Sequence, residues 1–406
     1  MNDLIIIGGG AAGMMSGIIA GRRNLKTVLL EKNEKLGKKL FITGKGRCNL
    51  TNSASDNDFF DNICTNKKFF YSAFYSFTNQ DAISFFEEIG LKTKEERGGR
   101  IFPESDKSSD VIKFLEKELK KADVDVQLNT EVLSLKKNND GVFEVKTNKG
   151  IFTSNKVIIA TGGKSYPVTG SKGDGYKFAE SFGHTVTPLY RSLVGIETFE
   201  NVKNLEGISL KNINVTITDG KKKVFSEFGE MLFTAHGVSG PVILSASSLL
   251  AKELGNKELN LHIDYKPAIP LQEFENKILK LFTENPNKKV LNALESILPS
   301  RLLNSCLEHS MVDKEKTVNS ITVEERKNIV NAFKDYKLSL KEACDWNQAI
   351  ITKGGVNVKE INPSTLESKI EEGLYFIGEV VDLDAFTGGF NLQIAWSMAY
   401  CCASNL

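Results

Sequence analysis

The sequence predicts an α/β protein in which a parallel sheet, covered by helices, is interrupted by a β-rich segment. The chain opens with a short apolar strand, a glycine-rich turn, a small-residue helix and a second apolar strand. Comparable apolar strands followed by small residues lie at 157–160 and 374–377, whereas the stretch from about 193 to 263 alternates between apolar and polar residues. Continuous apolar strands joined by helices form sheets buried on both faces, and alternation is typical of antiparallel strands.

The composition excludes several classes of protein. The 406 residues are 41% hydrophobic and 25% charged, as in ordinary globular proteins. The 52 basic residues nearly balance 51 acidic ones, which removes the general electrostatic argument for a nucleic-acid-binding protein. No apolar run approaches the ~18 residues of a membrane span, and the acidic N-terminus does not resemble a signal peptide. The six scattered cysteines predict neither a disulfide framework nor a metal site, so we expect a cytoplasmic protein. Because no membrane span is predicted, we expect no membrane partner.

Local patterns predict the individual elements in order. In the first half, apolar spacing and turn signals predict strands at 4–7, 27–30, 124–128, 132–135, 143–147, 151–153 and 157–160, and helices ending at about 22 and spanning 79–90 and 110–122. In the second half, they predict strands at 213–217, 223–225, 259–263 and 374–377, helical structure from 271 to about 336, and a final helix at 391–403. Pro299 is expected in the first turn of a helix.

A glycine motif, Gly8-x-Gly10-x-x-Gly13, directly follows the first strand and opens the first helix. Gly8 permits a tight turn, Gly10 lets the backbone approach a pyrophosphate, and Gly13 allows close packing of helix and strand. The helix N-terminus offers free N–H groups and the positive end of its dipole to the phosphates. Glu31, at the end of the second strand, is placed to accept hydrogen bonds from ribose hydroxyls. The motif predicts an adenine dinucleotide and leaves NAD and FAD both open.

Three further features favour FAD. Residues 160–163, Ala-Thr-Gly-Gly, follow a buried strand and indicate a second turn near the phosphates. Gly378-Glu379 follows another strand, at a point where an acid commonly holds the ribityl or pyrophosphate region. Residues 387–389, Thr-Gly-Gly, precede the last helix, whose N-terminal dipole can stabilise an anionic reduced flavin ring. One extended cofactor would tie these segments together.

The positions of these motifs predict the domain organisation. Because they lie at both ends of the chain and the middle lacks them, we expect a discontinuous nucleotide-binding domain of residues 1–192 and 352–406. The middle would then hold a β-rich insert of residues 193–266 and 337–351, with a helical subdomain of residues 267–336.

The segment 37–52, GKKLFITGKGRCNLTN, is far more specific than the glycine motif. Together with residues 378–382 and 387–393, it closely resembles the BaiN/YhiN-type family of bacterial flavoproteins. The resemblance runs from the first strand to the last helix. It implies a Rossmann-like FAD-binding domain with an inserted β-barrel-like domain that carries a helical subdomain. It also implies an NAD(P)/FAD-dependent oxidoreductase, and one branch of the family is associated with reducing conjugated double bonds in 3-oxo bile acids.

The motifs and the resemblance together imply a set of FAD-binding residues. The set comprises Gly8, Gly10, Ala11, Ala12, Gly13, Glu31, Lys32, Lys38, Lys39, Thr43, Gly44, Arg47, Cys48, Asn49, Val132, Thr161, Gly162, Gly378, Glu379, Gly389, Phe390, Asn391 and Leu392. Within it, the resemblance implies Val132 at the adenine, and Glu379, Asn391 and Leu392 toward the flavin end. We expect Asn391 to affect the reduction potential more than the affinity for FAD.

Arg47 and His236 are the candidates for catalytic roles. Arg47 lies in a glycine-flanked loop and could neutralise cofactor charge or bind an anionic substrate, the alternative being a surface cation. His236, in a loop of the insert, could donate a proton to a reduced substrate carbon, the alternative being a structural histidine. Cys48 could act as a redox thiol, but no partner cysteine is near in sequence, and we favour a packing role.

The leading functional hypothesis is an FAD-dependent oxidoreductase that passes a hydride from NAD(P)H through flavin N5 to an enone-like double bond of a small molecule. The sequence contains no second G-x-G-x-x-G motif, so NAD(P)H would be a transient electron donor. The alternatives are an oxidase of amines or other small molecules that uses O₂, an FAD-dependent RNA-modifying protein, and a non-catalytic flavin sensor or electron-transfer protein. The balanced charge weighs against the RNA-modifying alternative.

Overall fold

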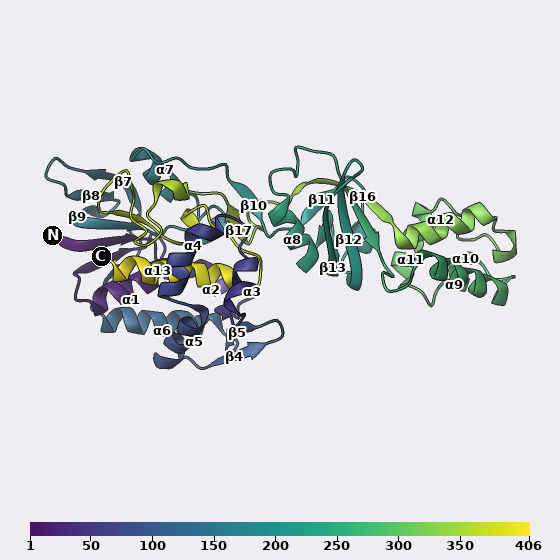
Figure 1. Cartoon of the computed structure of the whole chain (residues 1–406), viewed down its shortest axis with the longest axis horizontal. Helices are drawn as coiled ribbons and strands as arrows, with labels where there is room; N and C mark the ends of the chain where they lie inside the picture. The colour runs from purple at the N-terminus through teal and green to yellow at the C-terminus, as the bar shows by residue number, and fades with distance from the viewer. The chain divides into compact units, whose positions relative to one another are not determined.

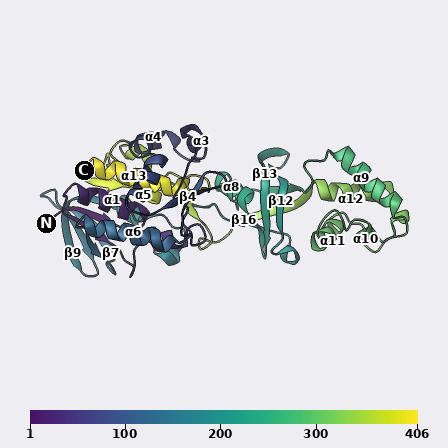
Figure 2. The same ribbon diagram turned by 90° about the horizontal axis from the view of Figure 1, so that it is seen from below.

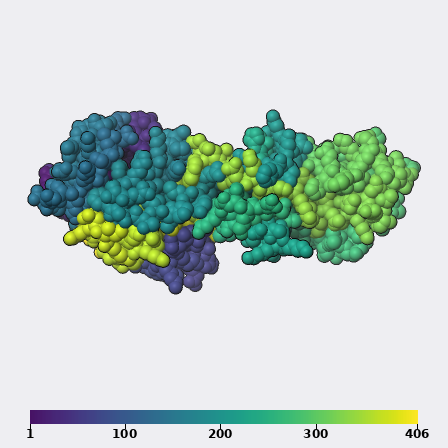
Figure 3. Space-filling view, turned by 90° about the horizontal axis from the view of Figure 1, so that it is seen from above, coloured from purple at the N-terminus to yellow at the C-terminus, as the bar shows by residue number.

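The structure, a computed structural model, describes all residues from 1 to 406 and divides into two compact units (Figure 1). The first combines Met1–Ser192 with Asp345–Leu406, and the second is Leu193–Cys344. In the space-filling view of Figure 3, the first unit carries colours from both ends of the scale, because the start and the end of the chain fold into the same body.

The first unit is built on a seven-stranded sheet in the order β6-β2-β1-β9-β8-β7, with β18 also paired to β9. The pairs β6–β2, β2–β1, β1–β9 and β9–β18 are parallel, whereas β7, β8 and β9 form an antiparallel meander. The strands are β1 (Asn2–Ile7), β2 (Thr27–Leu30), β6 (Asp125–Gln127), β7 (Val132–Lys137), β8 (Phe143–Thr147), β9 (Gly150–Ile159) and β18 (Leu374–Phe376).

Strand β9 corrects the sequence interpretation, which expected separate strands at 151–153 and 157–160. It is one continuous strand of 10 residues. Its first half pairs with β8, and its second half pairs with β1 on one edge and β18 on the other. The polar residues between the two apolar runs resemble a break in the sequence. However, Ser154 is fully buried and its hydroxyl donates to the carbonyl of Lys156, so the strand continues.

Helix α1 (Ala11–Arg22) packs beside α13 (Phe390–Ser404) and α6 (Ser108–Lys121), as Figures 1 and 2 show. Both α1 and α13 are apolar around most of their circumference, as expected for helices covered on several sides. The other helices of this unit are α2 (Lys38–Ile42), α3 (Asp56–Asp61), α4 (Lys67–Ser76), α5 (Asn79–Glu88) and α7 (Asp174–Ser181). Two small sheets complete it, formed by β3 (Thr51–Asn52), β5 (Arg100–Pro103) and β4 (Thr93–Glu96), and by β10 (Tyr190–Ser192) with β17 (Ile351–Lys353).

The second unit contains a closed barrel in the order β11-β14-β13-β12-β15-β16. Its strands are β11 (Ile196–Thr198), β12 (Ser209–Asp219), β13 (Lys222–Thr234), β14 (Gly237–Ser239), β15 (Leu259–Asp264) and β16 (Tyr336–Ala343). Four helices lie between β15 and β16 in sequence. They are α9 (Leu271–Glu284), α10 (Val290–Ala293), α11 (Ser300–His309) and α12 (Val323–Lys334).

Three details of this unit differ from expectation. Helix α8 (Pro241–Leu249), which packs against β13, was not predicted, because its small and apolar residues show no amphipathic period. Tyr336 begins β16 and does not end the helical segment. Pro299 occupies the N-cap position directly before the first turn of α11, with a φ of −55° that its ring fixes. The predicted fold class, a Rossmann-type α/β domain with an inserted barrel and helices, is confirmed. None of the helices combines the length and hydropathy needed to cross a bilayer.

A buried histidine ties two loops of the first unit together. The His184 side chain is fully buried, with Nδ1 3.1 Å from a Glu360 carboxylate oxygen and Nε2 2.7 Å from the Ser368 hydroxyl. That hydroxyl oxygen already accepts two backbone N–H bonds, from Ile370 and Glu371. The Ser368 hydroxyl therefore donates its hydrogen to Nε2 of a neutral His184. If the ring were protonated, the N–H at Nε2 and this O–H would be two donors facing each other. Burial lowers the pKa of His184 below its ordinary value.

We expect the first unit to lose stability as the pH falls through about 6.5, the ordinary pKa of histidine. Below this pH, His184 binds a proton in the unfolded chain but stays neutral in the native protein, so the free energy of unfolding decreases. The decrease levels off once the pH is below the lowered pKa of the native His184. Both tryptophans, Trp346 and Trp396, lie in this unit, so their fluorescence reports urea unfolding there. The variant His184→Gln should show a smaller difference between pH 8 and pH 5 than the wild type. An equal difference would exclude His184 as its source.

Candidate functional site

A pocket lies along the carboxyl edge of the parallel strands of the first unit. Its floor comprises the ends of β1, β2, β9 and β18, represented by Gly8, Glu31, Ala160 and Ile377. Neighbouring strands are about 4.8 Å apart, so β2 and β18 are separated by about 14 Å. A ligand that follows this edge must be extended. The order of the strands places the β2 side and the β18 side at opposite ends of it.

The turn after β1 is closed by glycines at two positions. Gly8 has a φ of +109°, and a Cβ there would lie 2.5 Å from the carbonyl oxygen of Ala160. A Cβ on Gly13 would lie 1.8 Å from the carbonyl oxygen of Gly8, so helix and strand approach as closely as glycine allows. A Cβ on Gly10, in contrast, would meet nothing within 4 Å.

Helix α1 begins directly after this turn. The first amides of a helix have no acceptor within it, and here the backbone from Gly8 to Ala12 lines the pocket. These donors and the helix dipole fit an anion. The open space beside Gly10 is where a pyrophosphate would approach, so the residues present fit the phosphate part of a dinucleotide.

Glu31 stands at the end of β2 and is 7% exposed. One carboxylate oxygen accepts from the amide of Gly9 at 2.8 Å, and the other accepts from the backbone and side-chain amides of Asn33 at 2.8 and 2.7 Å. Glu31 thus fixes the glycine turn as well as facing the pocket. A carboxylate has about four acceptor positions, so capacity for a ribose hydroxyl is left.

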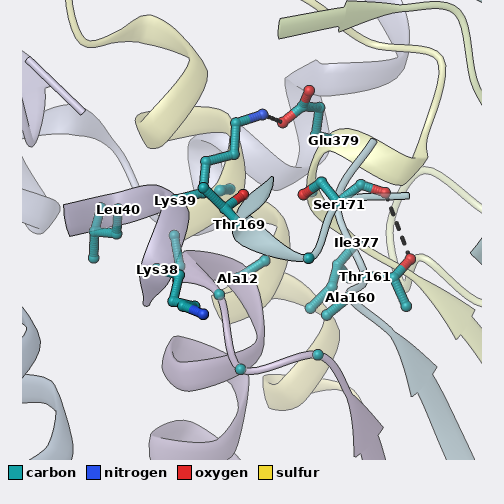
Figure 4. A pocket seen from close by; sticks show the side chains of 18 of the residues that line it. Ala12, Lys38, Lys39, Leu40, Ala160, Thr161, Thr169, Ser171, Ile377 and Glu379 are labelled. Carbon is teal, nitrogen blue, oxygen red and sulfur yellow. Dashed lines mark hydrogen bonds and ion pairs between the residues drawn. The ribbon is translucent and has the colours of Figure 1, made fainter. Parts of the chain in front are cut away.

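Lys39 and Glu379 meet at the β18 side of the pocket (Figure 4). The Lys39 ammonium is 2.5 Å from one Glu379 oxygen and 2.6 Å from the hydroxyl of Ser165. The other Glu379 oxygen accepts from that hydroxyl and from the amide of Thr352, each at 2.8 Å. Two further lysines of the lining have carboxylate partners of their own, Lys32 with Asp174 and Lys38 with Glu34.

Most of the predicted cofactor residues lie in this pocket. The lining includes Gly8, Gly10, Ala11, Ala12, Glu31, Lys32, Lys38, Lys39, Thr43, Val132, Thr161, Gly162, Gly378, Glu379, Asn391 and Leu392. The structure does not bring the remaining predicted residues into the lining. These are Gly13, Gly44, Arg47, Cys48, Asn49, Gly389, Phe390 and, in the second unit, His236. Gly13 and Gly389 act on backbone packing, because a Cβ on Gly389 would lie 2.3 Å from the carbonyl oxygen of Thr51.

Arg47 has its charge satisfied within the protein. Its guanidinium pairs with Glu96 and Asp106 and lies over the ring of Phe102, 4.1 Å from the centroid. The two carboxylates raise the pKa of Arg47. The structure therefore supports neither a pocket contact nor a free anion site for Arg47. Cys48 is fully buried, and burial raises the pKa of its thiol, which agrees with the packing role that we favour.

Asn391 and His236 are two further predicted residues whose surroundings the structure describes. The Asn391 side chain accepts from the amide of Ala385 and donates to the carbonyls of Ala385 and Phe386, so it holds the loop before α13. His236 lies in the turn between β13 and β14, as its sequence context predicts.

Sequence reasoning missed part of the lining. It did not assign Gly9, Asn33, Thr130, Glu131, Thr169, Gly170, Ser171, Asp174, Ile350, Ile351, Thr352, Leu383, Asp384, Ile394 or Ala395. Most of these come from loops that follow the strands and carry no pattern of their own. Gly9 lies inside the glycine motif, and the glycine-rich stretch around residues 170–175 is a further segment that resembles the family.

A parallel sheet with a glycine turn after β1, a buried acid at the end of β2 and a long pocket at its carboxyl edge is typical of a Rossmann-type dinucleotide-binding protein, here with an inserted barrel. The chain belongs to the family described as HI0933-like protein Rossmann domain, which matches residues 2–405. This confirms the family resemblance and places the chain among FAD-dependent oxidoreductases.

The similarity to known proteins extends over the whole chain. The 3-dehydro-bile acid delta(4,6)-reductase of Clostridium scindens is 32% identical over 403 residues, which are 98% of each chain. The ribosomal RNA dihydrouridine synthase of Escherichia coli is 32% identical over 408 residues, which cover 100% of this chain and 98% of the relative. Among solved structures, 3-ketosteroid delta1-dehydrogenase from Sterolibacterium denitrificans has a TM-score of 0.53 at 13% identity, covering 99% of this chain and 98% of the other. That likeness shows the fold alone.

Proposed function

We propose that the protein reduces a carbon–carbon double bond conjugated to a carbonyl group in a small molecule, in the cytoplasm, with FAD as the cofactor and NAD(P)H as the electron donor. The observation that carries the proposal is the chemistry shared by its full-length relatives. A delta(4,6)-reductase of 3-dehydro bile acids and a dihydrouridine synthase are both named for saturating such a bond. In uracil, too, the bond that becomes saturated is conjugated to a carbonyl.

The residues of the pocket divide the binding of FAD among them. When bound, FAD supplies hydride transfer. We assign the pyrophosphate to the turn from Gly8 to Ala12 and the adenosine ribose to Glu31, which leaves the flavin half for the side of Lys39 and Glu379. Saturation of the bond requires a hydride at the carbon β to the carbonyl and a proton at the α carbon. His236 stays our candidate for the proton donor.

The cofactor is expected to be FAD and not FMN, because Glu31 and the dinucleotide turn serve the adenosine half that FMN lacks. Purified protein should therefore be yellow and release FAD on denaturation. Chromatography of the released flavin checks this. FMN alone, or no flavin after reconstitution, would contradict the assignment.

The electron donor and acceptor can be tested in one anaerobic experiment. In stopped flow, NADH or NADPH should bleach the bound flavin, and a 3-oxo-Δ4 steroid should then reoxidise it with formation of the saturated ketone. If reoxidation occurs only with O₂ and yields peroxide, the protein is an oxidase. If no acceptor gives steady-state turnover, a sensor or electron-transfer role replaces the reductase.

A second candidate is reduction of uridine in ribosomal RNA. It is favoured by two full-length relatives of this name, from Escherichia coli and Haemophilus influenzae, at 32% and 31% identity. The near-zero net charge gives no general support for RNA binding. Mass spectrometry of ribosomal RNA from cells with and without the gene decides between the candidates. Loss of a dihydrouridine on deletion, restored by the wild-type gene, would establish the second.

A further inference from the structure

The Lys39–Glu379 pair lies on the side of the pocket that we assign to the flavin half of FAD. Glu379 directly follows β18, three strands away from β2, where Glu31 stands. The glycine turn after β1 lies between them in the sheet. A dinucleotide with its ribose at Glu31 and its pyrophosphate at the turn must therefore extend its other half toward β9 and β18. Lys39, from α2, reaches the same place.

The pair is held from several sides. Ser165, itself fully buried, bonds to both partners, and the backbone amide of Thr352 bonds to Glu379. The side chains of Lys39 and Glu379 are 23% and 21% exposed, so water screens them only in part. The Lys39 ammonium uses two of its three N–H groups on Glu379 and Ser165, which leaves one for a ligand.

The two charges act on a flavin in opposite directions. Reduction adds negative charge to the flavin, so a nearby cation favours the reduced form and a nearby anion favours the oxidised form. Since Lys39 and Glu379 are in contact, their fields nearly cancel at a distance. The pair therefore contributes little net field at a distance, although each of its two members carries a full charge.

We propose that Lys39 and Glu379 form a compensated charge pair that sets the reduction potential of the bound flavin, with Ser165 and Thr352 as positioning residues. This inference rests on the proposed binding of FAD and adds a role to residues assigned only to holding it. Lys39 stabilises the reduced flavin, and Glu379 limits that effect and fixes the ammonium in place.

The test is potentiometry of holoprotein variants during slow enzymatic reduction with a reference dye. Lys39→Met removes the cation and should lower the potential. Glu379→Gln removes the anion, keeps an oxygen for Thr352, and should raise it. Each change should alter the ratio of reduced to oxidised flavin at a fixed potential by on the order of tenfold. The double variant K39M/E379Q should return toward the wild-type value.

Lys137→Met is the matched control. Lys137 pairs with Glu371 at 2.8 Å with side chains 20% and 28% exposed, but neither residue lines the pocket. Loss of the Lys137 charge should leave the reduction potential of the flavin unchanged.

Equal potentials for wild type, K39M and E379Q, all with FAD bound, would overturn the inference. A shift of the same sign in both single variants would overturn it too. If the wild type binds no FAD, the proposed function fails first. If the potentials shift as expected but no enone is reduced, only the proposed substrate class fails.

Discussion

Replacing Gly13 by alanine is expected to destabilise the first unit, whereas replacing Gly10 by alanine should leave its stability unchanged and weaken the binding of FAD. The Cβ that Gly13→Ala adds would lie 1.8 Å from the carbonyl oxygen of Gly8, and backbone cannot rotate away as a flexible side chain can. Overpacking of this kind costs about 1–3 kcal/mol and sometimes more. The Cβ that Gly10→Ala adds would meet no protein atom within 4 Å, but it would occupy the space assigned to the pyrophosphate.

Two measurements separate these effects. Urea unfolding followed by tryptophan fluorescence should give a lower midpoint for Gly13→Ala and an unchanged one for Gly10→Ala. FAD titration of the apoprotein should show weaker binding for both variants. Wild-type affinity in Gly10→Ala would place the pyrophosphate elsewhere, and wild-type stability in Gly13→Ala would mean that helix and strand separate more easily than their contact indicates.

Glu31→Ala is expected to weaken FAD binding by about ten- to a hundredfold. Losing a charge-assisted bond to the ribose costs on the order of 1.5–3 kcal/mol. The variant also frees the amide of Gly9, which Glu31 holds at 2.8 Å. Glu31→Gln keeps one carboxamide oxygen for Gly9, but it removes the negative charge and turns an NH₂ group toward the two donors of Asn33.

FAD titration of the three proteins measures this. If Glu31→Gln binds almost as tightly as the wild type while Glu31→Ala does not, the main role of Glu31 is to hold the turn. If both lose affinity, the bond to Gly9 alone does not account for the role of Glu31. Binding of FAD to Glu31→Ala with wild-type affinity would show that the ribose assignment is wrong.

The parts of this fold that could be predicted are those with local signals. The first strand, glycine turn, helix and acid follow one another within 31 residues, and each limits the conformation of the next. The closed barrel lacks such signals, because its strands pair across the chain and its closure depends on β11 meeting β16. Only the family resemblance implied it. Helix α8 was missed because burial on most sides removes amphipathic periodicity.

The pocket was predicted better along the strand ends than in the loops. Glu31 and Glu379 follow apolar strands, so their place at the edge of the sheet is dictated by the fold. The environment of Arg47 could not be predicted, because its partners Glu96 and Asp106 lie 49 and 59 residues away. Likewise, nothing near Asn391 indicates that its side chain turns back to Ala385 and Phe386.

The pairing of β9 with β18 determines which part of the protein can fold first during synthesis. Leu374 is in register with Val157, although the whole second unit separates them in sequence. The barrel strands pair with one another within residues 193–344, so the barrel can form during synthesis before the C-terminal residues appear, whereas the sheet needs those residues. Until then β9 has an open parallel edge, which is a template for misassembly. A chain that ends before residue 374 would therefore carry a finished insert on an unfinished sheet, and such products should aggregate or be degraded.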